Sequence, residues 1–399
     1  MSIVASLRSG DWLISRRLRH YPVLFLLCWL VVATAWVANG EGVFDPAGKP
    51  LGTDFVNVWA ASIMALRGEA AGVYDFVRHG AVEQAVMGPR LGASYYGWHY
   101  PPMFLLVVLP VALLSYGSAL LVYLAVTLQV YWPVVRAIIP GRTALLAAFA
   151  FPGAWINIGH GQNGFLTTGL LGGGLVLLDR RPALAGVLLG LLSYKPQFGL
   201  LIPLALMVTG RWVTIAAAAV TVGAVSLVSL VVFGEETWRA FLASTEVSRT
   251  IILERGATGW YRIQSVFSAA RLLGASVPLA YGVQAAAGVA AAVAVVRVWR
   301  QAPSPGVAAA ILVAATPLTT PYILDYDLVM LILPLAWMAR EIVEHGALPW
   351  EKTVLAAVWL LPLVARTVAL YPGLPLTPLG LVALVVVIMR RAAVRPAAP

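Results

Sequence analysis

The residues best suited to chemistry in this chain are the few charged and polar side chains that interrupt its apolar runs. Asp54 follows Thr53 at the start of an amphipathic segment, after the first long apolar run has ended. A carboxylate stands out here because 60% of the residues are hydrophobic and only 11% are charged. Polar groups at or within a membrane are costly and tend to be kept for function, so Asp54 is a candidate for chemistry. The alternative is that Asp54 only stabilises the positive end of a helix, which contributes less than about 1 kcal/mol at an exposed end.

A second set of polar residues is suited to binding. Lys195 precedes Pro196, and its ammonium group, with three donors, suits either a phosphate or the lipid headgroup region. His99 and His160 either act in a site or serve as structural hydrogen-bond partners at the membrane interface. Gln162 either contributes to the same site or satisfies backbone groups of its loop.

Asp325 and Asp327 have the spacing of a two-carboxylate metal motif, and hard divalent cations prefer oxygen ligands. Such a pair alone is a weak signal, and we expect one of the two carboxylates to face away on a helix. Cys28 is the only cysteine, which excludes an intramolecular disulfide and a cysteine metal site.

The composition of the chain excludes a water-soluble globule. The 399 residues have a mean hydropathy of +0.86, and apolar runs recur almost to the C-terminus. These runs are continuous rather than alternating, which favours membrane-spanning helices over a β-barrel. The net charge of +10 does not indicate nucleic-acid binding, because the Arg residues cluster at the ends of apolar runs, where helices meet anionic headgroups. We therefore predict an all-α, polytopic integral membrane protein.

The apolar runs predict about 12 transmembrane helices in a single integral domain, residues 1–399. The expected spans are residues 21–38, 118–139, 143–158, 163–178, 183–196, 197–209, 212–233, 278–297, 305–321, 326–343, 353–371 and 374–390. With both termini in the cytoplasm, the basic connections fall on the cytoplasmic side, as charge bias requires. Residues 103–114 are expected to be a re-entrant or interfacial segment, because another span there would place Arg180 and Arg181 outside.

Two long polar stretches, residues 39–99 and 234–277, then form extracytoplasmic loops. In the first, apolar residues from Phe55 onward repeat at helical spacing, so we expect a helix along the membrane surface with Thr53 as its N-cap. Five polar clusters reach this face of the membrane, at Asp54 and at residues 99–102, 159–163, 194–197 and 321–327. Their convergence predicts a functional site there.

Several short motifs occur in an order that resembles a known family. They are Thr53-Asp54-Phe55, Val73-Tyr74-Asp75, His99-Tyr100-Pro101-Pro102, Gly161-Gln162-Asn163, residues 185–190 leading to Lys195-Pro196, Gln264-Ser265 and the turn at residues 321–327. Each motif is short, but together, across nearly the whole chain, they resemble glycosyltransferase family 87, the polyprenyl-phosphate-mannose-dependent mannosyltransferases of the GT-C superfamily. The chain departs from the family pattern at Ile263, where relatives often have Asn, and at Tyr326 and Asp327, where some have His. Both departures concern the acceptor and the fine chemistry.

The resemblance implies a GT-C-type fold and an inverting transfer of a hexose, mannose in the family, from a polyprenyl-phosphate donor to an acceptor hydroxyl. It implies that Asp54 is the general base. Donor phosphate or sugar binding is expected of Lys195 first, because a cation there would stabilise the leaving phosphate, and then of His99, Tyr100, Gln162, Arg262 and Gln264. Acceptor or sugar orientation is expected of Asp325, Asp327 and His160.

The expected partners are the lipid-linked donor, a glycolipid or glycan acceptor and membrane lipids. No metal and no other cofactor is expected, because a sugar carried on a lipid monophosphate does not oblige a metal. The alternative is a divalent cation bound by Asp325 and Asp327. The expected location is the bacterial inner membrane, with the site on the extracytoplasmic side.

Two other classes of protein compete with this prediction. A transporter or flippase of lipid-linked sugars would also use broken helices and an intramembrane Lys, but we would expect inverted repeats and polar residues near the membrane midplane. A noncatalytic assembly protein would not need Asp54, Lys195 and Asp325 to converge. The sequence leaves the sugar, the acceptor, the polyprenol length and the oligomeric state open.

Overall fold

The computed structural model describes residues 2–301 and 304–394, and these residues form helices and turns but no β-strand. The α-helices are α1 (Ile3–Ser9), α2 (Ser15–Ala38), α3 (Phe55–Leu66), α4 (Phe76–Met87), α5 (Met103–Val108), α6 (Tyr116–Ile138), α7 (Arg142–Phe149), α8 (Pro152–His160), α9 (Gly164–Leu177), α10 (Pro182–Leu191), α11 (Ile202–Val208), α12 (Trp212–Val247), α13 (Val266–Leu272), α14 (Val277–Arg300), α15 (Pro305–Ala315), α16 (Ile332–His345), α17 (Glu351–Leu370) and α18 (Leu376–Val394). Short 3-10 helices connect them, notably η1 (Ala70–Tyr74), η3 (Leu109–Leu113), η4 (Leu192–Tyr194), η5 (Pro196–Gly199) and η8 (Asp325–Leu331). The all-α prediction is confirmed.

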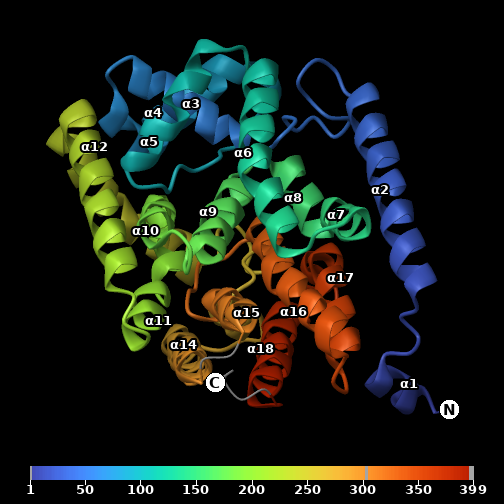
Figure 1. Cartoon of the computed structure of the whole chain (residues 1–399). Helices are drawn as coiled ribbons and strands as arrows, with labels where there is room; N and C mark the ends of the chain where they lie inside the picture. The colour runs from blue at the N-terminus through green and yellow to red at the C-terminus, as the bar shows by residue number, and fades with distance from the viewer. Residues whose placement is uncertain (1, 302–303, 395–399) are drawn as a thin grey trace.

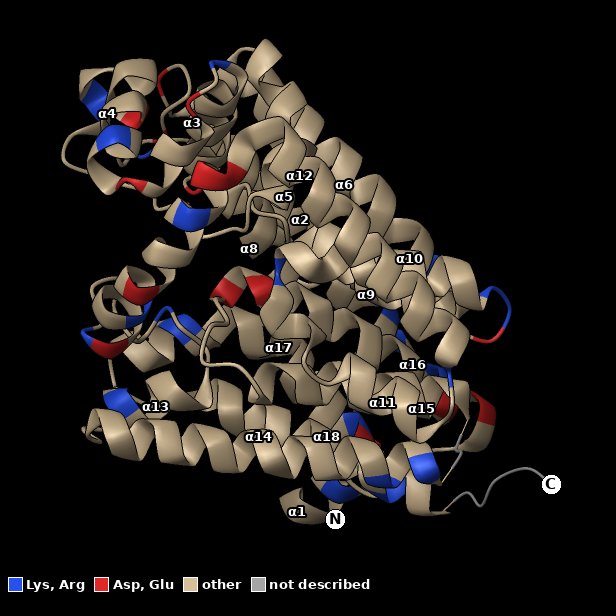
Figure 2. Cartoon of the chain, turned by 90° about the vertical axis from the view of Figure 1, so that its left-hand side faces the viewer, with Lys and Arg blue, Asp and Glu red and all other residues tan. Residues whose placement is uncertain are grey.

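Six helices in the described part of the chain are long and apolar enough to cross a membrane. They are α2, α6, α12 with its extension to Glu254, α14, α17 and α18. The charged residues of α6 and α14 lie near their C-terminal ends, and α12 carries none before Glu235, so each of these helices has a long uncharged stretch (Figure 2). Large apolar side chains on α2 and α12 are exposed, as expected of helices that face lipid. The chain is therefore a polytopic helical membrane protein.

The other expected spans are formed by helices that are shorter or interrupted. Residues 143–158 form two helices, α7 and α8, because Pro152 cannot continue the first and instead occupies the first turn of the second. Residues 183–209 contain α10 and α11, separated by 3-10 turns around Pro196. Residues 326–343 begin as the 3-10 helix η8 before α16. These interruptions place polar residues inside the helical body.

The second long loop is also more helical than expected. α12 bends at Gly234, whose φ of 80° only glycine adopts readily, and then continues to Val247. A π-helical segment follows as far as Glu254. Glu235 and Arg239, one turn apart with Nη2 and Oε1 at 2.8 Å, support the continuation.

The first long loop folds into a compact helical module. α3 packs against α4, α5 and η3, and nine of its residues are buried. The N-cap of α3 is Asp54 and not Thr53 as expected, because the helix begins one residue later, at Phe55. In Figure 1 this module lies at the top, beside α6 and α12, whereas α1 and the end of α18 lie at the bottom.

The centre of the molecule is formed by η8, whose seven residues are all buried. α8, α9, α16 and α17 contact it, so the acidic first turn of η8 is held inside the helical body. Close helix packing elsewhere depends on glycine: a Cβ at Gly190 of α10 would lie 2.8 Å from the carbonyl oxygen of Ala218 in α12. Small residues at such contacts let the backbones of membrane helices approach each other.

Candidate active site

Two glycines bring Asp54 against the end of α8. Gly52 and Gly161 both have left-handed backbones, with φ of 64° and 61°. A Cβ on Gly161 would lie 2.7 Å from the Cβ of Phe55 and 3.1 Å from the Cα of Gly52, so only glycine allows this approach. As a result, the backbone N–H of Asp54 donates to the carbonyl of His160 at 3.0 Å.

The carboxylate of Asp54 is held by side chains and not by its own helix. It makes no side-chain capping hydrogen bond to α3, although Asp54 occupies the N-cap position. Gln162 Nε2 donates to Oδ2 at 3.3 Å, and the hydroxyl of Thr53 donates to Oδ1 at 3.4 Å. The side chain of Asp54 is 25% exposed, so one edge of a well-oriented carboxylate is open to a ligand.

The orientation of the Gln162 amide follows from its other contacts. Its Oε1 accepts from the hydroxyl of Tyr100 at 2.8 Å and from the backbone N–H of Asn163 at 3.2 Å. The amide nitrogen must therefore face Asp54. Tyr100 and Gln162 were both predicted to be site residues. Tyr100 orients the amide of Gln162, and Gln162 in turn orients the carboxylate of Asp54.

His160 bridges two carboxylates. Its Nδ1 lies 3.6 Å from Asp54 Oδ2, and its Nε2 lies 3.6 Å from Asp325 Oδ1. Burial by itself lowers the pKa of the imidazole, but the charges of Asp54 and Asp325 overcome this and raise the pKa to about 10. His160 is therefore a cation at neutral pH, and the structure brings it together with Asp54 and Asp325 as a charged row.

At the other end of this row, Asp325 forms an ion pair with Arg366, which was not among the predicted site residues. Arg366 Nη1 lies 2.9 Å from Asp325 Oδ2, and the backbone N–H of Tyr326 donates to Oδ1 at 2.9 Å. Burial favours the neutral carboxyl, but hydrogen bonds and charge from His160 and Arg366 hold the pKa of Asp325 below its usual value. Arg366 lies in the last turns of the apolar helix α17. A lone Arg in such a run is itself a functional signal, and it could have found this residue.

Lys195 is paired with Asp327 and is not open to a ligand. Its Nζ lies 2.6 Å from Asp327 Oδ1, and its side chain is only 3% exposed. The rings of Phe198 and Tyr326 lie beside the ammonium, with centroids 5.5 and 5.1 Å away. Withdrawing one member of a buried ion pair costs about 3–5 kcal/mol. In this arrangement Lys195 anchors η8, which does not match the leading phosphate role expected of it.

Asp327 and Asp325 are both buried, and each is paired with a different cation. Besides Lys195, Asp327 accepts the backbone N–H of Leu324 through Oδ2 at 3.0 Å. Asp325 and Asp327 are thus each engaged by a different cation and do not form one pair of metal ligands. Direct orientation of a sugar or acceptor by Asp327 does not match this burial.

Three predicted residues lie outside the charged row. His99 is exposed, and its Nδ1 pairs with the hydroxyl of Ser248 at 3.0 Å. Gln264 is buried and accepts from the hydroxyl of Thr377 at 2.5 Å, so it links the loop to α18. Arg262 is half-buried and contacts the ring of Tyr261.

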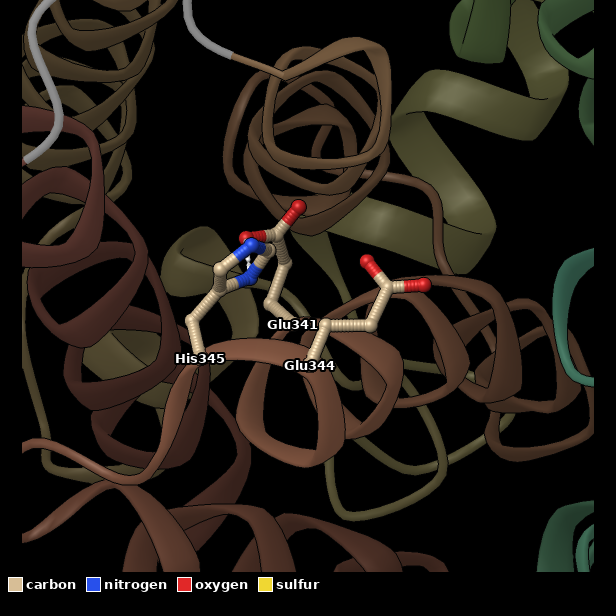
Figure 3. A group of neighbouring side chains, drawn as sticks. All are labelled: Glu341, Glu344 and His345. Carbon is tan, nitrogen blue, oxygen red and sulfur yellow. Dashed lines mark ion pairs between the residues drawn. The ribbon is translucent and has the colours of Figure 1, made fainter.

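Among the described residues, Glu341, Glu344 and His345 form the group whose ligand atoms lie close enough together to hold a metal ion (Figure 3). They lie in the last turns of α16, whereas η8 with its two carboxylates precedes the first turn of that helix. Glu341 lies 3.4 Å from His345, and Glu344 lies 2.8 Å from Arg340. This cluster is therefore separate from the candidate active site.

The fold and the site together define a polytopic membrane protein with a partly exposed, hydrogen-bonded carboxylate near buried charged groups. The family model of glycosyltransferase family 87 matches residues 98–321, more than half of the chain. The chain therefore belongs to glycosyltransferase family 87 and is a membrane glycosyltransferase. Comparisons with curated proteins and with solved structures found no match.

Proposed function

We propose that the protein transfers a hexose, mannose by family resemblance, from a polyprenyl-phosphate donor to an acceptor hydroxyl, with inversion at the anomeric carbon. The supporting observation is the setting of Asp54. Its carboxylate makes no capping hydrogen bond and is partly exposed. It is oriented by Gln162 and by the cation His160. A general base needs this combination of fixed geometry and access to the acceptor.

In the proposed reaction, Asp54 accepts the proton of the acceptor hydroxyl while that oxygen forms a bond to the anomeric carbon. The bond from this carbon to the phosphate oxygen breaks, and the polyprenyl phosphate leaves with the electron pair. Attack opposite the leaving group inverts the anomeric centre. His160 stays protonated beside Asp54 and stabilises the carboxylate before the proton is taken.

We propose no metal or other cofactor for this reaction. Asp325 is paired with His160 and Arg366, and Asp327 is paired with Lys195. Protein cations therefore occupy the positions at which a divalent ion would have to bind these carboxylates. A mannose transfer that persists in excess chelator is the expected result, and its loss, with recovery on adding a divalent cation, would contradict the proposal.

The base assignment is tested with purified protein, polyprenyl-phosphate-mannose and candidate acceptors. Asp54→Asn keeps the shape of the side chain and should lower the transfer rate by about 10²- to 10⁴-fold, the range for loss of a general base. Asp11→Asn, at an exposed position beside α1, is the matched control. Transfer that is absent from both proteins, or unchanged by Asp54→Asn, would refute the proposal. Movement of the donor across proteoliposomes without transfer would replace it by transport.

We propose that the protein lies in a bacterial inner membrane with both termini cytoplasmic and the site extracytoplasmic. α1 and the end of α18 lie at one end of the molecule and the α3 to α5 module at the other (Figure 1), which supports this arrangement. Lys49→Cys and Arg181→Cys change exposed positions. In a Cys28→Ser background, an impermeant thiol reagent should label position 49 in intact cells and position 181 only after permeabilisation. The reverse pattern would contradict this topology.

A further inference from the structure

The charges around the site leave one cation without a carboxylate. Asp54 and Asp325 are opposed by His160 and Arg366. Arg262 adds a further positive charge, and no carboxylate of the described residues lies within ion-pair distance of it. A site with one excess cation is suited to an anionic ligand.

Tyr261 joins the two arginines. The guanidinium carbon of Arg262 lies 5.6 Å from the centre of the Tyr261 ring, and that of Arg366 lies 5.9 Å from it. Arg262 also donates from Nε to the Tyr261 hydroxyl at 3.3 Å. Both guanidinium groups thus adjoin one aromatic side chain, a contact that leaves their remaining N–H groups free to bind oxygen atoms.

The backbone fixes this arrangement relative to the charged row. The N–H of Gln264 donates to the carbonyl of Ile323 at 2.7 Å, two residues before Asp325. Gln264 in turn is bound to Thr377 of α18. The segment that carries Arg262 is therefore attached to the same turn that presents Asp325 to Arg366.

The charged row connects the base to Arg366. Asp54 and Asp325 each lie 3.6 Å from a ring nitrogen of His160, and Asp325 lies 2.9 Å from Arg366. Arg366 is 35% exposed, unlike Lys195, so it is accessible to a ligand that also reaches Asp54.

We infer that Arg262 and Arg366 bind the phosphate of the lipid-linked donor and stabilise it as it leaves. This inference rests on the proposed function. Guanidinium groups bind phosphate oxygens in pairs with fixed geometry, and the donor phosphate becomes more negative as its bond to the sugar breaks. Two preorganised cations at that point lower the barrier. Arg262 and Arg366 therefore take the role that the sequence assigned first to Lys195.

Binding of farnesyl phosphate, a short polyprenyl phosphate, to the full-length protein in detergent tests this inference. Arg262→Gln and Arg366→Gln should each weaken its binding by about tenfold or more. Farnesol, which lacks the phosphate, should bind the variants and the native protein alike. Arg255→Gln removes the same charge from an exposed position of the same loop and is the matched control.

Variants must be shown to fold for this result to count. Arg262 has no ion pair to lose, so Arg262→Gln should keep the native thermal stability. Arg366→Lys keeps the charge opposite Asp325 but loses the planar guanidinium group. It should therefore be more stable than Arg366→Gln and still bind farnesyl phosphate weakly. Native affinity in both Gln variants, or inhibition of binding by phosphatidylglycerol or inorganic phosphate as strong as by farnesyl phosphate itself, would overturn the assignment.

The two proposals fail in different ways. Asp54→Asn should bind farnesyl phosphate at least as tightly as the native protein, because it removes a negative charge and leaves both arginines in place. Binding that depends on the arginines in a protein without transferase activity would leave the phosphate site standing and refute the proposed function. If the native protein transfers the sugar but the arginine variants bind farnesyl phosphate as tightly as the native protein does, the phosphate site alone would be refuted.

Discussion

Asp54 and His160 are joined twice, once through the backbone and once through their side chains. The N–H of Asp54 donates to the carbonyl of His160 at 3.0 Å, while Asp54 Oδ2 lies 3.6 Å from His160 Nδ1. The backbone contact holds Asp54 against the end of α8, and the imidazolium of His160 lies beside its carboxylate. Residues from the first loop and from the end of α8 are thereby held as one unit.

Removing the charge of His160 should shift the pH dependence of transfer. In His160→Gln, Asp325 loses one of the two cations that lower its pKa, so this carboxylate is protonated more easily. The acid limb of the activity profile should move upward by about one pH unit or more. Initial transfer rates from pH 4.5 to 9 give this profile. His20→Gln, on the exposed face of α2, is the control, and an unchanged profile in His160→Gln would contradict the proposed role.

The backbone contact predicts a sharp difference between two glycines that lie two residues apart. Gly161→Ala places a methyl group against Phe55 and Gly52 at a left-handed position, so His160 and Asp54 should separate. We expect an about tenfold or larger loss of transfer rate. Gly159→Ala adds the same methyl group at a position with no atom within 4 Å and should leave the rate near native. Equal rates in the two variants would show that the approach of Gly52 and Gly161 is not needed.

The sequence predicted that the polar clusters converge, because each lies where an apolar run ends. Asp54, His160, Gln162, Tyr100 and Asp325 indeed meet. The sequence did not predict that Lys195 pairs with Asp327, because the two residues are far apart in the chain and neither motif indicates which residue it contacts. A lysine at a membrane boundary has the same local pattern whether it binds a ligand or a buried carboxylate.

Helix boundaries were harder to predict than helix existence, for reasons visible in single residues. Gly234 followed by two glutamates is typical of a loop, yet α12 continues because glycine allows a bend and Glu235 pairs with Arg239. Pro152 divides a run that is apolar throughout. Arg366 lies within the apolar helix α17 and not at the end of an apolar run, so the pattern of polar clusters in the sequence does not include it.

The Lys195 and Asp327 pair should show strong energetic coupling. Lys195→Met or Asp327→Leu alone leaves one buried charge unpaired and should destabilise the protein by about 3–5 kcal/mol, whereas the double variant should recover most of that loss. Unfolding in mixed micelles measures the three free energies. The exposed i, i+4 pair of Arg239 and Glu235 offers a matched cycle, with an expected coupling of about 0.5 kcal/mol or less. Additive losses at Lys195 and Asp327 would contradict the pairing.

Glu83 and His79 make stability depend on pH in the first-loop module. Both side chains are fully buried, with His79 Nδ1 and Glu83 Oε1 3.8 Å apart. Burial raises the pKa of Glu83 to about 8, and burial lowers that of His79 to about 4. Both groups are thus mainly neutral near pH 7.

The signs of these shifts predict where stability is lost. The raised pKa of Glu83 removes stability as pH rises from 4.5 to 8, whereas the lowered pKa of His79 adds stability from pH 4 to 6.5. The effects of Glu83 and His79 oppose each other up to pH 6.5. Above pH 6.5, of these two residues only Glu83 still changes the free energy of unfolding, by about 2 kcal/mol by pH 8. His160 adds a loss of the same sign between pH 6.5 and 10. Glu83→Gln removes only the Glu83 contribution. Between pH 6.5 and pH 8, the free energy of unfolding should therefore fall by about 2 kcal/mol less in the variant than in the native protein. Equal falls in the two proteins would show that Glu83 is already ionised at pH 6.5.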